Sequence, residues 1–225
     1  MRPGKGTVSR ASSAAPSLAA LGRALSGRLP GSGMRIGLLG GSFNPAHDGH
    51  LDLSKTALDR LSLDEVWWLV SPQNPLKPKD DMAGLDQRVA QARASVDHPQ
   101  IRVTALEAEL GTRYSIDTVK ALKRQFPEVH FVWLMGADNL IQLPDWKDWE
   151  QLARQIPVAV FSRPGYSKRA LGSKPAKLFA DCRVSEQRAD QLAGTPPPAW
   201  AFIHGPRNPS SSTAIRKQVP EKGET

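Results

Sequence analysis

With 225 residues, 40% of them hydrophobic, and a single cysteine, Cys182, the chain is long enough for one domain with a sizeable core and excludes a fold held by an intrachain disulfide. No apolar run approaches the ~18 residues of a membrane span, and the lone cysteine fits a reducing compartment, so we expect a cytoplasmic protein. The formal net charge of +8 falls to +3 without the five basic residues of the first 33 positions, which favours a protein that binds several phosphates over one that binds nucleic acid.

The first 33 residues differ in composition from the rest of the chain. They are rich in Ser, Ala, Gly and Arg and contain no acidic residue; their basic residues are Arg2, Lys5, Arg10, Arg23 and Arg28. This composition predicts disorder, and it is also typical of an organelle transit peptide. A third interpretation is that the chain proper starts at Met34. We therefore expect residues 1–33 to be a disordered or non-native extension, with at most a weak helical turn over residues 18–25.

From Met34 onward, short apolar segments alternate with amphipathic ones. They predict strands over residues 35–40, 66–71, 101–104, 129–135, 157–162 and 200–204. They predict helices over residues 50–62, 85–96, 115–125, 147–155 and 212–218. The alternation is typical of βαβ units, so we expect a single α/β domain over residues 34–218, with a Rossmann-like, doubly wound and mostly parallel sheet covered by helices on both faces. Residues 164–199 contain too many Pro and Gly to assign, and residues 219–225 are predicted to be a flexible tail.

A glycine-rich turn joins the first predicted strand to the first helix. Residues 40–51 read G-G-S-F-N-P-A-H-D-G-H-L. The N–H groups of such a turn and the positive end of the helix dipole attract an anion, and His47 and His50 can stabilise charge that builds on a phosphate. Gly49 leaves space for a nucleotide between them. The alternative is that both histidines only cap the helix or bind turn carbonyls.

The chain leaves the second predicted strand through an irregular loop. Residues 70–79 read V-S-P-Q-N-P-L-K-P-K, and the three prolines exclude regular structure. Lys77 is the candidate cation of this loop, with a solvated surface lysine as the alternative. Lys79 is interpreted as a surface lysine.

Two later strands end in residues that suit a nucleotide site. The strand over residues 129–135 runs into Gly136 and Asp138. A carboxylate at the carboxyl end of a strand can accept two hydrogen bonds from a ribose diol, and Gly136 lets a nucleotide lie against the backbone. The next strand runs into Arg163, for which contact with adenine and plain surface charge stay open. Of the tryptophans that follow Asp138, Trp149 has the spacing of a core residue on a helix, and Trp146 is open to packing or binding.

Two serine-containing segments precede predicted helices. Ser115 has the residue type preferred at a helix N-cap. Residues 209–216 read P-S-S-S-T-A-I-R, in which Ser211, Ser212 and Thr213 form an N-cap cluster and Arg216 follows one turn later. Hydroxyls, unpaired N–H groups and an arginine at a helix N-terminus also suit a phosphate.

Together these segments resemble the H-x-G-H nucleotidyltransferase superfamily, and the turn over residues 40–51 is most similar to that of the bacterial nicotinate-nucleotide adenylyltransferases. The likeness runs from Gly40 to Arg216. It implies transfer of AMP from ATP to nicotinate mononucleotide, giving deamido-NAD and pyrophosphate in pyridine nucleotide biosynthesis. It also implies that Mg²⁺ is carried by the ATP phosphates, with no metal site on the protein.

The resemblance implies a role for each motif in binding ATP. His47 and His50 would act on the α-phosphate, Asp138 would bind the adenosine ribose, and the serine–threonine cluster would hold the β- and γ-phosphates. The ATP-binding residues would be Gly40, Gly41, Ser42, Phe43, His47, His50, Gly136, Asp138, Arg163, Ser211, Ser212, Thr213 and Arg216.

For the acceptor, the resemblance implies a separate set of residues. Trp146 would stack on the pyridine ring, and Tyr114 and Ser115 would face its carboxylate. Lys77 would approach the acceptor's phosphate and act with the two histidines in catalysis. The acceptor-binding residues would be Asn44, Lys77, Tyr114, Ser115 and Trp146.

Other functions are compatible with parts of the sequence. The acceptor could be nicotinamide mononucleotide or phosphopantetheine, although Tyr114 and Ser115 favour nicotinate. The chain could be an inactive nucleotide sensor, but such a protein would be expected to lack a histidine of the turn or Arg216. Nucleic-acid binding would rest on the basic first 33 residues alone, and the oligomeric state is left open.

Overall fold

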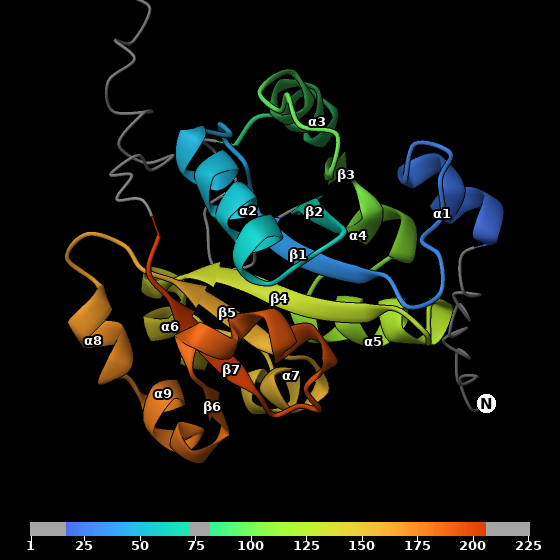
Figure 1. The fold of residues 1–225 in the computed structure, drawn as a ribbon. Coiled ribbons are helices and arrows are strands. Elements are labelled where there is room, and N and C mark those ends of the chain that lie inside the picture. Colours follow the sequence, from blue (N-terminus) through green and yellow to red (C-terminus); the bar gives the residue numbers. More distant parts are fainter. Residues whose placement is uncertain (1–16, 73–81, 206–225) are drawn as a thin grey trace, which may run out of the picture.

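A computed structural model describes residues 17–72 and 82–205 of the chain, and these residues form a seven-stranded sheet between two layers of helices (Figure 1). The strands are β1 (Arg35–Gly41), β2 (Glu65–Val70), β3 (Ile101–Thr104), β4 (His130–Gly136), β5 (Val158–Phe161), β6 (Arg183–Val184) and β7 (Trp200–Ile203). Their order is β3-β2-β1-β4-β5-β7-β6, and every neighbouring pair is parallel. The expected Rossmann-like α/β domain is therefore confirmed.

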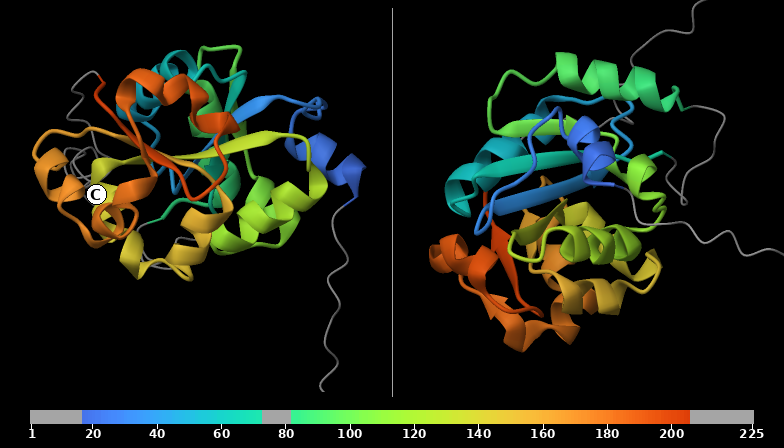
Figure 2. Two further views of the ribbon diagram at one scale, coloured as in Figure 1. Left: turned by 60° about the horizontal axis from the view of Figure 1, so that its bottom comes forward. Right: turned by 90° about the vertical axis from the view of Figure 1, so that its right-hand side faces the viewer.

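The helices are α1 (Leu18–Ala24), α2 (Asp48–Arg60), α3 (Leu85–Ala94), α4 (Leu106–Leu110), α5 (Ser115–Gln125), α6 (Ala137–Gln142), α7 (Trp149–Gln155), α8 (Ser167–Leu171) and α9 (Lys174–Leu178), with 3₁₀ helices η1 (Leu143–Asp145), η2 (Ala180–Cys182) and η3 (Glu186–Gly194). Two further views show them on both sides of the sheet (Figure 2). The unassigned residues 164–199 hold α8, α9, η2, β6 and η3. None of the helices described here is long and apolar enough to cross a membrane.

Each face of the sheet has its own core, because successive side chains of a strand point to opposite faces. Trp67 belongs to the cluster under α5, α6 and α7, and its neighbour Trp68 to the cluster under α2, α3 and η3. All six residues of β2 are buried. Apart from Glu65, the residues of this strand are apolar, as is typical of a strand buried on both faces, and short apolar segments predicted all the strands except the two-residue β6.

The order in which the chain adds strands to the sheet reverses at β1, which lies between β2 and β4. The chain moves outward from β1 to β3, then crosses back and moves outward on the other side from β4. In such sheets ligands bind outside the carboxyl ends of the strands at this reversal. The turn that carries His47 and His50 leaves β1 there, and Gly136 ends β4 beside it.

The expectation that residues 1–33 lie outside the fold is wrong for residues 17–33. Helix α1 is capped by the Ser17 hydroxyl, and its Leu21, together with Leu25 just beyond the helix, is fully buried in the core. The physical reason is that two leucines four residues apart place one apolar stripe on the domain, although the segment as a whole is polar. Residues 1–16 lie outside the described part of the chain.

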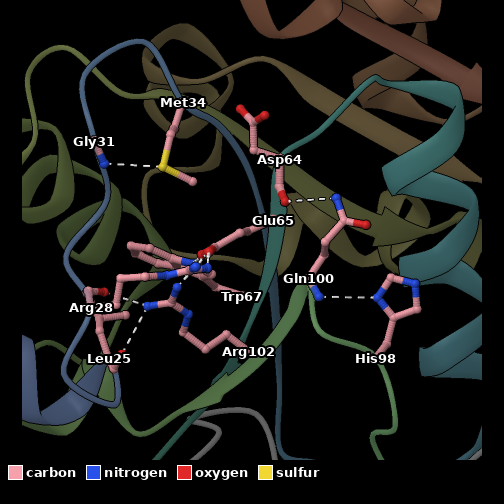
Figure 3. A network of polar contacts seen from close by, with 10 residues as sticks. All are labelled: Leu25, Arg28, Gly31, Met34, Asp64, Glu65, Trp67, His98, Gln100 and Arg102. Carbon is pink, nitrogen blue, oxygen red and sulfur yellow. Dashed lines mark hydrogen bonds and ion pairs between the residues drawn. The ribbon is translucent and has the colours of Figure 1, made fainter.

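Polar contacts hold this segment to the edge of the sheet (Figure 3). The buried Glu65 carboxylate pairs with Arg28 and with Arg102, and its other oxygen accepts the Trp67 indole N–H at 2.8 Å. Arg102 also donates to the carbonyls of Leu25 (2.9 Å) and Arg28 (2.6 Å). The carboxylate is thus surrounded by donors, as a buried charge requires.

Candidate active site

The turn after β1 is held in place by the burial of its aromatic residue. Phe43 has a positive φ of 46°, which costs energy for a bulky side chain. Its ring is 1% exposed and stacks on Trp68, with centroids 4.9 Å apart and planes 13° apart. Packing therefore fixes a backbone shape that the residue type disfavours. Ser42 is buried and Asn44 is half-buried in the same turn.

The two histidines meet at the start of α2, with ring centroids 3.9 Å apart. His47 is the N-cap residue, so α2 begins at Asp48 and not at the predicted residue 50. The backbone N–H of His47 donates to Nδ1 of His50 at 3.3 Å. Because Nδ1 accepts this bond, the neutral His50 ring carries its proton on Nε2, from which it can donate to an anion. The capping role and the binding role are therefore compatible.

His47 is buried and electrostatically tuned. Burial, aided by the charge of Arg163 and opposed by Asp48, lowers its pKa from 6.5 to about 4, so the ring is neutral at neutral pH. Its Nδ1 is buried and has no hydrogen-bond partner in the described part of the chain. An unsatisfied buried nitrogen costs free energy in the free protein, and it suits a position that a substrate group completes.

The ends of β4 and β5 meet at an ion pair. Asp138, in the first turn of α6, accepts from Arg163 through Oδ2 at 3.2 Å, while its Oδ1 is buried without a partner among the described residues. The expectation that this carboxylate accepts two hydrogen bonds from a ribose diol stays a prediction, with Arg163 already bound to Oδ2. Arg163 pairs with Asp138 and lowers the pKa of His47, so its guanidinium lies beside the histidine turn; its contact with adenine stays a prediction.

Gly136 is required by the close approach of this pair. A Cβ at residue 136 would lie 2.5 Å from Asp138 Oδ1 and 3.3 Å from Arg163 Nε. We therefore expect Gly136→Ala to displace both side chains, at a cost of about 1–3 kcal/mol, and to raise the dissociation constant of an ATP analogue roughly tenfold. Calorimetry on Gly136→Ala and on the control Gly194→Ala, where a Cβ meets nothing within 4 Å, checks this. Equal affinities in the two variants would contradict it.

A shallow open cleft lies next to the histidine turn, between α2 and the end of β5. Gly49 forms part of its wall. The lining residues are Gly49, Asp52, Leu53, Thr56, Phe161, Ser162, Arg163 and Gly205.

Two of the predicted acceptor residues, Tyr114 and Ser115, lie at the start of α5. Tyr114 is the N-cap residue and Ser115 the first residue of the helix, so the predicted cap at Ser115 is wrong by one position. Lys147 lies with Nζ 4.5 Å from the Tyr114 ring centroid and 3.3 Å from Asp117 Oδ2. Sequence reasoning missed Lys147, because only the fold brings the 146–147 segment to this helix end.

The aromatic side chains connect the acceptor residues to the histidine turn. Trp146 is partly buried and packs edge-on against Trp133, with centroids 6.1 Å apart. The Trp133 ring lies 3.0 Å from where a Cβ of Gly40 would be. Gly40 thus allows the buried Trp133 to lie against β1, and Trp133 in turn contacts Trp146. Trp149 is a buried core residue, as predicted.

A buried carboxyl group supports the start of α5. Glu107 is 5% exposed and accepts from the Thr118 hydroxyl at 3.0 Å; that hydroxyl also lies 2.8 Å from the Thr112 hydroxyl and 3.3 Å from the Tyr114 carbonyl. Burial raises the pKa of Glu107 to about 7. Sequence reasoning missed this residue because Glu107 stands in a short segment that reads as a polar helix face.

This pKa predicts a pH dependence of stability. Between pH ~4.5 and ~7 the folded state keeps a proton on Glu107 that the unfolded state releases, so this group's contribution to the free energy of unfolding is lost as pH rises through that range. We expect Glu107→Gln to lack this loss, which is on the order of 3 kcal/mol at most. Urea titrations at pH 5 and pH 8 measure it, with the exposed Glu109→Gln as the control. The same pH dependence in Glu107→Gln as in the wild type would contradict the assignment.

Several predicted site residues lie outside the described part of the chain: Lys77, Ser211, Ser212, Thr213 and Arg216. The predicted helix over residues 212–218 lies outside it too. Among the residues that are described, no group of three or more His, Cys, Asp or Glu side chains could hold a metal ion.

Comparison with known proteins gives a consistent result. The cytidylyltransferase-like family model matches residues 38–218. A probable nicotinate-nucleotide adenylyltransferase of Methylorubrum extorquens is 54% identical over 183 residues, which is 81% of this chain and 99% of that protein. One of Brucella suis is 46% identical over 184 residues, 82% of this chain and 95% of its own.

Solved structures share the fold. The Plasmodium falciparum nicotinic acid mononucleotide adenylyltransferase complexed with NaAD superposes with a TM-score of 0.63, at 17% identity, over 85% of this chain and 86% of that one. The same enzyme complexed with APC gives a TM-score of 0.62.

Proposed function

The chain belongs to the cytidylyltransferase-like family, and we propose that it is a nicotinate-nucleotide adenylyltransferase, a transferase of NAD biosynthesis. It transfers AMP from ATP to nicotinate mononucleotide and releases pyrophosphate, giving deamido-NAD. The observation that carries the proposal is the pair formed by His47 and His50, 3.9 Å apart between ring centroids, at the reversal point of a parallel sheet. Relatives that share about half of their residues with this chain carry the same name.

The reaction needs no nucleophile from the protein. The acceptor's 5′-phosphate is already ionised and attacks the α-phosphorus of ATP in line, so that one P–O bond forms while the bond to the β-phosphate's bridging oxygen breaks. Catalysis then consists of positioning and charge stabilisation. His50 donates from Nε2 and neutral His47 from its own ring N–H to the α-phosphate oxygens as negative charge moves onto the leaving pyrophosphate.

The ion pair beside the histidines suits the adenosine half of ATP. Asp138 Oδ1, which is buried and unpaired among the described residues, accepts a ribose hydroxyl. Arg163 holds the carboxylate in position through Oδ2, and its charge favours the triphosphate. From the resemblance of their motif, we assign Ser211, Ser212, Thr213 and Arg216 to the β- and γ-phosphates.

The cluster around Tyr114 suits an acceptor with a carboxylate. The pyridinium ring stacks on Trp146, where a desolvated cation–π contact is worth about 2 kcal/mol. The N-terminus of α5 and the Lys147 ammonium both favour an anion over a neutral amide at this end. Asn44 and Lys77 are assigned to the acceptor by resemblance.

We propose that Mg²⁺ reaches the site bound to the ATP phosphates, because Mg²⁺ usually keeps several waters and binds substrate phosphates. The histidines and Arg163 act in addition to it. We further propose the cytoplasm as the location and small nucleotides, not nucleic acid, as the partners.

The acceptor is tested by comparing initial rates of pyrophosphate release from ATP with three acceptors at equal concentration. We expect nicotinate mononucleotide to react fastest and nicotinamide mononucleotide to react at least tenfold more slowly, because the second lacks the charge that Lys147 and the helix end favour. Phosphopantetheine is expected to give no release above background. A higher rate with nicotinamide mononucleotide or with phosphopantetheine would assign a different acceptor.

A further inference from the structure

Arg88 is a buried arginine that neither the predicted motifs nor the proposed mechanism uses. It lies on α3 and is 1% exposed. Its guanidinium donates to four backbone carbonyls: Ala83 (2.8 Å), Ser42 (2.7 Å), Ser71 (2.9 Å) and Pro72 (3.1 Å). No carboxylate pairs with it in the part of the chain described here. Among the described residues, its charge is therefore balanced by carbonyl dipoles.

A buried charged side chain costs desolvation free energy that an apolar side chain in the same place would not. Burial lowers the pKa of Arg88, and an apolar side chain of similar volume is often at least as stable as a buried charge. What the guanidinium adds is a planar fork of five donors, which can bind several acceptors at fixed angles. Its partners come from three separate segments of the chain, which suggests that Arg88 serves to hold these segments together.

The joined segments border the proposed active site. Ser42 stands in the turn between β1 and His47, and Ser71 and Pro72 form the exit of β2. The two exits also touch directly, since the Ser71 N–H donates to the Gly41 carbonyl at 2.9 Å. Arg88 therefore sets how the histidine turn and the exit of β2 lie relative to each other.

The direction of these bonds matters for an anion. The peptide between Ser42 and Phe43 is planar and trans, so its N–H points opposite to its C=O. With the Ser42 carbonyl aimed at Arg88, the Phe43 N–H is turned away from Arg88. A phosphate site requires N–H groups toward the ligand and carbonyl oxygens away from it.

We propose that Arg88 is a positioning residue for adenylyl transfer: it draws the carbonyls of the histidine turn and of the β2 exit away from the phosphates and keeps the Phe43 N–H directed at them. The inference rests on the proposed function. Arg88 touches no substrate; it acts through the backbone of the turn.

The test compares Arg88→Lys with Arg93→Lys, a change on the same helix at an exposed arginine whose single carbonyl bond, to Val103, is 3.4 Å long. Lysine keeps the charge but cannot span four carbonyls. In Arg88→Lys protein shown to be folded by circular dichroism, we expect kcat to fall roughly 10–100-fold, because small misplacements of reacting groups cost that much. Arg93→Lys is expected to keep wild-type kcat. Wild-type kcat in folded Arg88→Lys would overturn the proposal, since a purely structural role changes only stability.

A second measurement needs no variant. Hydrogen exchange of the wild-type Phe43 amide, followed by NMR, is expected to slow at least tenfold on adding a non-hydrolysable ATP analogue at saturation. Unchanged exchange with the analogue bound would overturn the proposal even if Arg88→Lys does not fold. Failure of the proposed function is seen separately, as absence of pyrophosphate release from the wild type with every acceptor.

Discussion

Replacing His50 by alanine is expected to lower kcat for pyrophosphate release by roughly 10²–10³, the usual effect of removing one preorganised donor to a developing charge. The structure supports this size of effect because His50 Nδ1 accepts a hydrogen bond from the His47 backbone N–H. This bond fixes the orientation of the ring and so the position of the donor Nε2. Steady-state kinetics with ATP, Mg²⁺ and nicotinate mononucleotide measure it.

His130→Ala is the matched control for this change. His130 is the exposed first residue of β4, at the end of the strand away from Gly136. The control is expected to keep wild-type kcat and KM. A His50→Ala enzyme within threefold of the wild type would show that the turn binds nucleotide without stabilising the reaction, and the mechanism would have to be abandoned.

Replacing Leu21 by alanine is expected to lower the free energy of unfolding by roughly 2–5 kcal/mol, the usual cost of truncating a fully buried leucine. Leu21 is 0% exposed in the core under α1, whereas Leu18 on the same helix is 57% exposed. Leu18→Ala is therefore the control, with an expected change below about 0.5 kcal/mol. Urea denaturation measures both. Equal small effects would mean that residues 17–33 are dispensable, as the hypothesis of a start at Met34 implied.

Most of the strands could be predicted because each is a continuous apolar segment whose burial shows in its own sequence. A run such as Val66 to Val70 is apolar at every position, and it remains recognisable without knowledge of its neighbours. The histidine turn was predictable for a similar reason, since its glycines, histidines and following helix are contiguous. The structure places the two histidines at the start of α2, and their catalytic role stays a prediction.

The rest of the site depends on contacts between distant segments. Arg88 and Glu107 look like surface residues of polar helices, and only the packing of α3 and α4 on the sheet buries them. Lys147 lies against the ring of Tyr114, a contact that the sequence does not show because Tyr114 lies more than thirty positions earlier in the chain. Asp138 and Arg163 were each assigned alone, and their pairing follows from the parallel neighbours β4 and β5.

The short elements between β5 and β7 escaped prediction for another reason. Helices α8 and α9 have five residues each, too few for a 3.6-residue period to show. Helix α1 has seven, which is why the sequence indicated no more than a weak helical turn over residues 18–25. In each of these short helices, which residues form the apolar face depends on the neighbouring surface of the domain, and the sequence alone does not show that surface.

The central claim is that this chain joins AMP to nicotinate mononucleotide at the histidine turn. Its most direct test is mass spectrometry of the products formed from ATP, Mg²⁺ and nicotinate mononucleotide by the wild type and by His50→Ala. The account predicts deamido-NAD and pyrophosphate in equal amounts from the wild type and at least a hundredfold less from the variant. Consumption of ATP without the dinucleotide, or equal yields from both proteins, would contradict it.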